Sequence, residues 1–287
     1  MLKIDNYEVV GWDHAIRGMR NPKNSWDKSD SGWNELVYAP FGPEPSDEKL
    51  VSIPVIEEYE DEYYVGPADQ RLMEALRDGG PVHAKYRRMI TVYLDITAPL
   101  YWWKEFDTYK VGTVANSCST MHKIHAKEFT LDDFSTEHLI GGNDVVTLSD
   151  ELKEHLDIEE RYTLENHVLA TGEHDALPIE YEDRVEYLSP KDILEQYVIG
   201  ALNLYRKKFF EAKRKLMKEE AKRYWWQMIQ LLPSSYNQKR TIMLSYEVLA
   251  NMYRWRRDHK LDEWHTFCDW IESLPYSELI TGKEKGR

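Results

Sequence analysis

The fold of this chain is organised around residues Thr97 to Phe129, which have the sequence TAPLYWWKEFDTYKVGTVANSCSTMHKIHAKEF. The stretch is dense in aromatic, small polar and basic residues, and it has no long apolar run. Loops and helix starts that hold an anionic ligand are built from such residues. We therefore expect an anion-binding segment here, and the rest of the chain is placed around it.

A strand leads into this segment. Apolar and polar side chains alternate from Ile90 to Thr97, with the period of two that a half-buried strand requires. A helix is expected from about Leu100 to Lys110, and a loop from Gly112 onward. Residues Ser119 to Phe129 are expected to be helical or mixed.

Further elements are expected on both sides. Upstream, the pattern predicts a strand at Tyr7 to Gly11, short helical turns at Ala15 to Arg20 and a helix from Pro67 to Gly79. Downstream, helices are expected over residues 189–217, 219–232, 239–257 and 261–273, with Ser189 as the N-cap of the first.

These elements predict an α+β fold, with a mixed sheet and its helices in the N-terminal half and a helical C-terminal half. We expect one domain over residues 1–287. Two acidic stretches, near 40–64 and 135–187, have the composition of surface insertions.

Charge and cysteine content restrict the function classes. The chain has 287 residues, a formal net charge of −14 and an isoelectric point near 5.2. General nucleic-acid binding needs a basic surface, so it is not expected unless a local basic patch overrides the total. Only Cys118 and Cys268 are present, which predicts no disulfide framework and a reducing, cytoplasmic setting. The start has no signal-peptide pattern, and no apolar run approaches the about 20 residues that cross a membrane.

Several segments occur in an informative order. They are AIRGMRNPKNS (15–25), DQRLMEALRDGGPVH (69–83), ITVYLDITAP (90–99), the opening stretch, and LLPSSYNQKRTIMLSYEVLANMYRWRRD (231–258). In order and spacing they resemble the flavin-dependent thymidylate synthase family (ThyX) over most of the chain outside the two acidic stretches. By this resemblance Arg20 stands in the first arginine motif, and Asn251 and Arg256 stand at a helix asparagine and a nucleotide-binding arginine.

The resemblance implies a homotetramer that binds FAD and a pyrimidine nucleotide such as dUMP, with sites shared between subunits. The implied nucleotide-binding residues are Lys104, Glu105, Asn116, Ser117, Ser119 and Arg256, and the implied cofactor-binding residues are His83 and Lys110. The family's arginine-rich signature is altered, because Tyr109, Lys110 and Val111 stand in place of its Arg-His-Arg. Bidentate arginine is the natural phosphate clamp, and Lys110 replaces it with a single point charge.

Each site residue also has a structural interpretation. Lys104, Lys110, His83 and Arg256 could cap helices or pair with some of the 51 acidic residues. Asn116, Ser117 and Ser119 could be turn residues that satisfy their own backbone. For Cys118 a structural role is favoured over a Cys–His nucleophile, since proximity to His122 and His125 in sequence shows neither thiol activation nor facing geometry. No histidine spacing typical of a catalytic zinc is present.

Two functions are compatible with these patterns. The first is a flavin-dependent thymidylate synthase-like enzyme, a nucleotide methyltransferase that acts on dUMP or a related pyrimidine nucleotide. The second is a non-catalytic protein that binds a nucleotide or a protein partner on the same scaffold. The sequence leaves open whether the chain is an enzyme.

Overall fold

A computed structural model describes residues 2–33, 63–139 and 190–282 of the chain. These residues form two compact units, one over 119–237 and the other over 2–118 and 238–282. Most of the two acidic stretches lies outside the described residues. The expectation of one domain over 1–287 stays a prediction, and each unit is described by itself.

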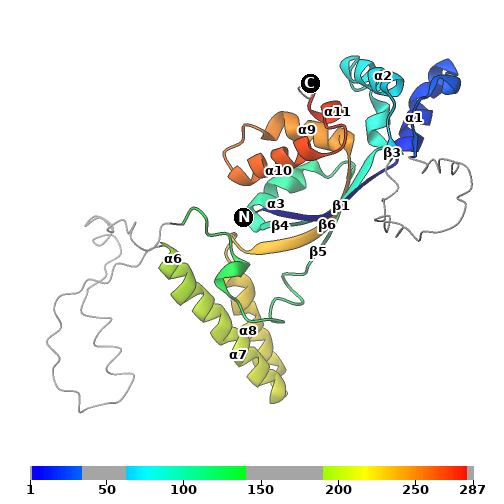
Figure 1. Cartoon of the computed structure of the whole chain (residues 1–287). Coiled ribbons are helices and arrows are strands. Elements are labelled where there is room, and N and C mark those ends of the chain that lie inside the picture. The colour runs from blue at the N-terminus through cyan, green and yellow to red at the C-terminus, as the bar shows by residue number, and fades with distance from the viewer. Residues whose placement is uncertain (1, 34–62, 140–189, 283–287) are drawn as a thin grey trace, which may run out of the picture. The chain divides into compact units, whose positions relative to one another are not determined.

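The larger unit is built on a four-stranded sheet with the order β1-β4-β6-β5 (Figure 1). Its strands are β1 (Lys3–Val10), β4 (Thr91–Pro99), β6 (Asn237–Ser245) and β5 (Thr113–Ser117). β1 pairs with β4, and β5 with β6, in antiparallel register. The strand predicted at residues 90–97 is therefore confirmed, with Val92, Leu94 and Ile96 buried.

Two predicted elements were wrong in this sheet. The helix expected over 239–257 is divided into strand β6 and helix α9 (Tyr246–Arg256). Gln238, Ile242 and Leu244 are buried in β6, and this period of two, together with β-branched Thr241 and Ile242, favours a strand. The loop expected from Gly112 onward is strand β5, which pairs with β6 and gains its stability from that tertiary contact.

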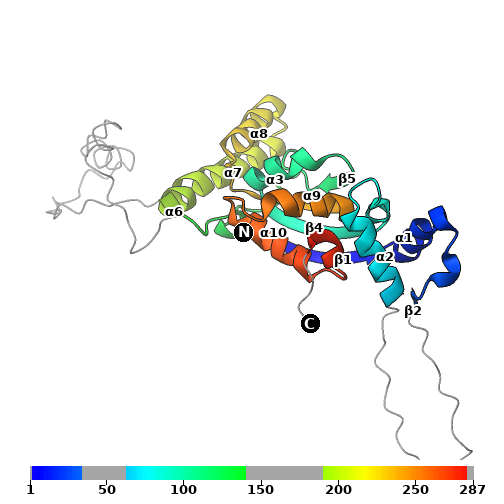
Figure 2. The same ribbon diagram turned by 90° about the horizontal axis from the view of Figure 1, so that it is seen from above.

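One face of the sheet carries the aromatic core of this unit. Helices α3 (Leu100–Phe106), α9 and α10 (Asp262–Ser273) lie over the same face, with the short helix α11 (Glu278–Thr281) beside them (Figure 2). Trp102, Trp103, Phe106, Trp264 and Phe267 are buried there and pack ring against ring. The predicted helices at 100–110 and 261–273 are confirmed, the first continuing as a 3-10 turn (Asp107–Tyr109).

The opposite face of the sheet is polar. Tyr93 of β4, Lys239 and Thr241 of β6 and Asn116 of β5 are exposed. Asp95 lies among them and accepts hydrogen bonds from Thr241 Oγ1 at 2.6 Å and Asn6 Nδ2 at 3.0 Å, with Lys239 Nζ 2.9 Å away. These three donors lower the pKa of Asp95 to about 2.

Helical segments flank the beginning of β4. They are α1 (Trp12–Arg20), α2 (Pro67–Asp78) and the 3-10 turns Asn21–Lys23, Trp26–Lys28 and Lys85–Arg88, with a two-stranded sheet of β2 (Gly32–Trp33) and β3 (Tyr63–Tyr64). Gly11, between β1 and α1, has φ +94°, and a Cβ there would lie 2.2 Å from the carbonyl oxygen of Met89. Glycine is therefore required at this turn.

The smaller unit is an antiparallel helical hairpin with a docked loop. Helix α6 (Pro190–Asp192) continues through a π-helical stretch (Ile193–Ile199) into α7 (Gly200–Arg214), and α8 (Lys218–Leu231) returns beside it. Leu202, Phe209 and Ala212 share a buried cluster with Ala221 and Met228. The two predicted helices are confirmed, while Ser189, their expected N-cap, lies outside the described residues.

The loop of this unit is held by side chains of α7. Asn203 accepts a hydrogen bond from the N–H of Phe129 and donates one to its carbonyl, both at 2.9 Å. No α-helix forms over Ser119 to Phe129, and a 3-10 turn follows at Leu131–Asp133. In the described part of the chain, no helix combines the length and the apolar character needed to cross a bilayer.

Candidate functional site

The end of α3 brings together two residues that the sequence predicts to bind a nucleotide. Arg256, on the last turn of α9, places Nη1 2.8 Å from Oε2 of Glu105 on α3. The side chain of Arg256 is 14% exposed and that of Glu105 is 42% exposed. The guanidinium is therefore held in place by the protein, and the carboxylate lies on its solvent side.

Two aromatic residues, Tyr109 and Trp264, also contact this arginine. Nε of Arg256 donates to the hydroxyl of Tyr109 at 2.8 Å, and the guanidinium lies 4.9 Å from the ring centroid of Trp264. Burial lowers the pKa of His259, and the positive charge of Arg256 lowers it further, which favours the neutral imidazole. Tyr109 and Trp264 together hold Arg256 in one orientation.

A second arginine sits on the same end of α3. Arg240 of β6 places Nη1 2.7 Å from Oδ1 of Asp107 and stacks 4.2 Å from the ring centroid of Trp103. Its Nε donates to Oε1 of Gln238 at 3.0 Å. Arg240 was not among the site residues predicted from the sequence, because a helix was expected over residues 239–257. The sequence pattern that indicates Arg240 is an arginine on the same face of an alternating strand as the buried residues Gln238 and Ile242.

The predicted cations lie at different places. Lys104 on α3 and Lys110 after the 3-10 turn are both exposed. His83 is exposed in the turn that follows α2. Within the described residues, no hydrogen bond or ion pair joins His83 to Lys110, so the contacts of one chain do not unite these two cofactor-binding candidates.

The predicted polar residues of β5 point to opposite faces of the sheet. Asn116 pairs with Thr241 and shares the polar face with Asp95, whereas Ser117 pairs with Arg240 on the aromatic side. Only Ser117 therefore lies on the side of the Arg256–Glu105 pair. The physical reason is that neighbouring strand residues alternate, whereas the predicted loop would have allowed both to converge.

Ser119 belongs to the smaller unit. Its Oγ accepts hydrogen bonds from the backbone N–H groups of Met121 at 3.2 Å and His122 at 2.9 Å. Ser119 therefore acts as a turn residue that satisfies nearby backbone groups, which is the structural interpretation given to it from the sequence. His125 of the same loop packs its ring 4.5 Å from that of Phe209, centroid to centroid, which gives this histidine a structural partner.

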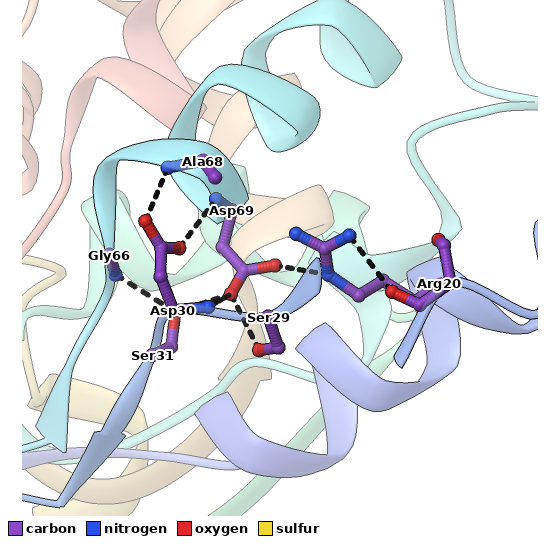
Figure 3. Close-up of polar contacts among 8 residues, drawn as sticks. Arg20, Ser29, Asp30, Ser31, Gly66, Ala68 and Asp69 are labelled. Carbon is purple, nitrogen blue, oxygen red and sulfur yellow. Dashed lines mark hydrogen bonds and ion pairs between the residues drawn. The ribbon is translucent and has the colours of Figure 1, made fainter. Parts of the chain in front are cut away.

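Arg20 has a structural partner instead of a ligand. It is buried, and its Nε donates to Oδ1 of Asp69 at 2.6 Å (Figure 3). Oδ2 of Asp69 accepts from the hydroxyls of Ser29 and Ser31, each at 2.7 Å, and from the N–H of Asp30 at 3.1 Å. The acceptors of Asp69 are thus engaged by the protein, and the network ties residues 20–31 to the start of α2.

Asp30 provides the other half of this network. Its carboxylate accepts from the N–H groups of Ala68 at 2.8 Å and Asp69 at 3.0 Å, in the first turn of α2 (Figure 3). A Cβ at Gly66 would meet the Asp30 carboxylate at 2.2 Å, so only glycine permits this approach. Such capping by a residue distant in sequence leaves no local sequence pattern.

A cavity of about 440 Å³ lies between the end of α9 and α10. Its lining includes Arg257, His259 and His265, but also the three carboxylates Asp258, Asp269 and Glu272. Cys268 lines it as well, and burial raises the pKa of this thiol to about 12. Three negative charges make this cavity unfavourable for a phosphate, and the thiol is neutral at pH 7.

Known proteins share the fold of this chain. One is the crystal structure of thymidylate synthase X (ThyX) from Helicobacter pylori with FAD and dUMP. Its structural alignment with this chain covers 98% of each chain, with a TM-score of 0.50 and 12% sequence identity. The fold is ThyX-like. A second structure of the Helicobacter pylori enzyme, complexed with FAD and dUMP, covers the same shares at 12% identity with a TM-score of 0.47. The sequence matches no known protein-family profile and no curated protein.

The predicted α+β, ThyX-like fold is thereby confirmed, and 12% identity shows the fold alone. In the described part of one chain, residues 109–111 offer the two phosphates of FAD a single cation. At the altered signature Tyr109 is bonded to Arg256, Val111 is apolar, and Lys110 is a single exposed cation. At the end of α3, Arg240 and Arg256 each lie beside a tryptophan ring and are each paired with a carboxylate.

Proposed function

We propose that the chain binds a pyrimidine nucleotide, such as dUMP, through its phosphate at the end of α3. One observation carries this proposal. The Arg256 guanidinium is paired with the half-exposed Glu105, while the hydroxyl of Tyr109 and the ring of Trp264 hold the guanidinium in place. The Glu105 carboxylate occupies the position that a phosphate would take. A half-exposed glutamate can rotate into water and leave the planar donors of the arginine to the ligand.

Neighbouring charges favour the same ligand. Lys104 and Lys110 are exposed and flank Glu105 and Asp107, the carboxylates that pair with the two arginines, and these are the two acidic residues within 104–110. Displacing Glu105 from Arg256 leaves a net positive site, and Ser117 adds a hydroxyl on the same side of the sheet. Asn116, Ser119 and His83 are part of the proposal only through the family resemblance.

Titration calorimetry with dUMP tests the proposal. We expect saturable binding of dUMP and much weaker binding of deoxyuridine, which lacks the phosphate. Equal binding of the two ligands would mean that Arg256 does not hold a phosphate. No heat and no thermal shift with any pyrimidine nucleotide would reject the proposal.

Flavin-dependent methylation of the nucleotide is the second candidate function, and the ThyX-like fold favours it. Because one chain does not unite His83 and Lys110, FAD would have to be held with residues of a second copy, as in the homotetramer that the resemblance implies. The visible spectrum of the purified protein decides between the candidates. A bound-flavin spectrum supports the enzyme, and a colourless protein that takes up no added FAD supports a binding protein.

A further inference from the structure

The helical hairpin of the smaller unit carries a charge opposite to that of the whole chain. Residues 200–223 include nine lysines and arginines but only three glutamates, a net charge of +6 within a chain of −14. We call this segment, Gly200 to Arg223, the basic hairpin. A phosphate close to the surface responds to local charge, because salt screens the rest of the protein beyond about 8–10 Å.

The cations of the basic hairpin are available to a ligand. Lys207, Lys208, Lys213, Arg214 and Lys215 are all exposed. Among the described residues none of the nine bases forms an ion pair with an acidic side chain. In contrast, Arg20, Arg240 and Arg256 of the larger unit are each paired with a carboxylate. The positive charge of the hairpin is thus not neutralised within the described structure.

An open groove of about 700 Å³ runs along one side of α7. The residues that line it from this helix include Asn203, Leu204, Arg206, Lys207, Phe210 and Arg214. Lys207 and Arg214 are seven residues apart, so they stand on the same side of the helix about 10.5 Å from each other. The groove has one acidic lining residue, Glu128, among these cations.

Aromatic and apolar surface lies between the cations. Phe210 is half-buried in the groove, with the guanidinium of Arg206 5.3 Å from its ring centroid. Arg206 is itself fixed, since its Nε donates to the carbonyl of His125 at 3.0 Å. Leu204 is 50% exposed beside them. A groove that offers both cations and an aromatic ring suits a chain of phosphates and bases better than it suits a simple inorganic anion.

We propose that the groove of the basic hairpin binds single-stranded nucleic acid. Lys207 and Arg214 would contact backbone phosphates two helical turns apart, and a base would stack at Phe210 against Arg206. This site lies wholly in the smaller unit and does not depend on the nucleotide site at the end of α3. The net charge of −14 argues against general nucleic-acid binding, but the basic hairpin is a local basic patch that would permit it.

Fluorescence anisotropy with a labelled 20-residue oligothymidylate tests the proposal on the full chain. We expect binding at 50 mM salt that weakens steeply by 200 mM. The double variant Lys207→Glu/Arg214→Glu should weaken binding at least about 10-fold and reduce the slope of log K against log salt by about 1.4, the value for two lost single-strand contacts. Its matched control is Lys28→Glu/Arg71→Glu, with the same charge change at exposed residues of the larger unit, and it should bind nearly as well as wild type.

A second variant separates stacking from charge. Phe210→Leu keeps apolar volume, so we expect about 5-fold weaker binding or more with an unchanged salt slope. Circular dichroism checks that each variant retains its helices. The proposal would be overturned by absence of binding at 50 mM salt, by equal losses in both charge-reversal variants, or by tighter binding of a duplex of the same length.

Discussion

Arg20 and Asp69 form a buried ion pair, with 2.6 Å between Nε and Oδ1 and side chains that are 5% and 0% exposed. Further hydrogen bonds support the pair, because Arg20 Nη1 also donates to the carbonyl of Ser25 at 3.1 Å and Asp69 accepts from two serines. Charges buried in this way are costly to separate, since the remaining partner keeps its desolvation penalty. The pair therefore fixes the packing of α1 against α2 and is structural.

Asp69→Asn should destabilise the larger unit by about 3 to 5 kcal/mol, because it leaves the Arg20 charge buried without a counter-charge. Urea denaturation followed by tryptophan fluorescence measures the change. The control is Asp13→Asn, an exposed carboxylate in the first turn of α1, with an expected effect within about 0.5 kcal/mol. Similar effects of the two substitutions would contradict a buried, tightly coupled pair.

Acid should weaken the fold through Asp95. Hydrogen bonds from Thr241, Lys239 and Asn6 hold its pKa at about 2 in the folded chain, below the ordinary value of 3.8. A depressed folded pKa stabilises the native state above about pH 4, and this contribution is lost as the pH falls from 4 towards 2. Asp95→Asn should therefore lower the melting temperature at pH 7 and have little effect near pH 2.

Thermal unfolding recorded between pH 2 and pH 7 checks the prediction for Asp95. Asp27→Asn, at an exposed position of the larger unit, is the control. A difference between wild type and Asp95→Asn that stays constant over the whole pH range would show that the carboxylate charge is not the cause.

Glu105→Gln should tighten the binding of dUMP about 3- to 10-fold, because it removes the carboxylate that competes with phosphate for Arg256. Arg256→Lys should weaken it about 10-fold or more, since lysine lacks the planar donors and the stacking on Trp264. Arg254→Lys, on an exposed position of the same helix, should leave the affinity unchanged. Tighter binding by wild type than by Glu105→Gln would show that Glu105 contacts the ligand favourably.

The two cysteines should differ in reactivity. Cys118 is exposed, whereas Cys268 is buried with its pKa raised to about 12. Iodoacetamide at pH 8 should therefore modify Cys118 alone in the native protein, and Cys268 only after denaturation, because the thiolate is the nucleophile. Peptide mass spectrometry identifies the modified residue. Labelling of native Cys268 at a rate comparable to Cys118 would contradict its burial.

The sequence was sufficient where the signal is local. The alternation from Ile90 to Thr97 predicted β4, and local sequence patterns predicted helices α2, α7, α8 and α10, because such patterns depend on neighbours along the chain. The order of motifs predicted the ThyX-like fold, which is confirmed. Glu105 and Arg256, two predicted nucleotide-binding residues, form an ion pair at 2.8 Å, and their role in binding stays a prediction.

Tertiary structure decided what depends on contacts between distant segments. β5 and β6 are strands because they pair with each other, and that pairing turns Asn116 and Ser117 to opposite faces. Arg240 reaches Asp107 only across the sheet, and Arg20 meets Asp69 across 49 residues of chain. The physical reason is that strand backbones and buried charges need partners that only folding brings together. Helix periodicity and composition, in contrast, are properties of each segment by itself.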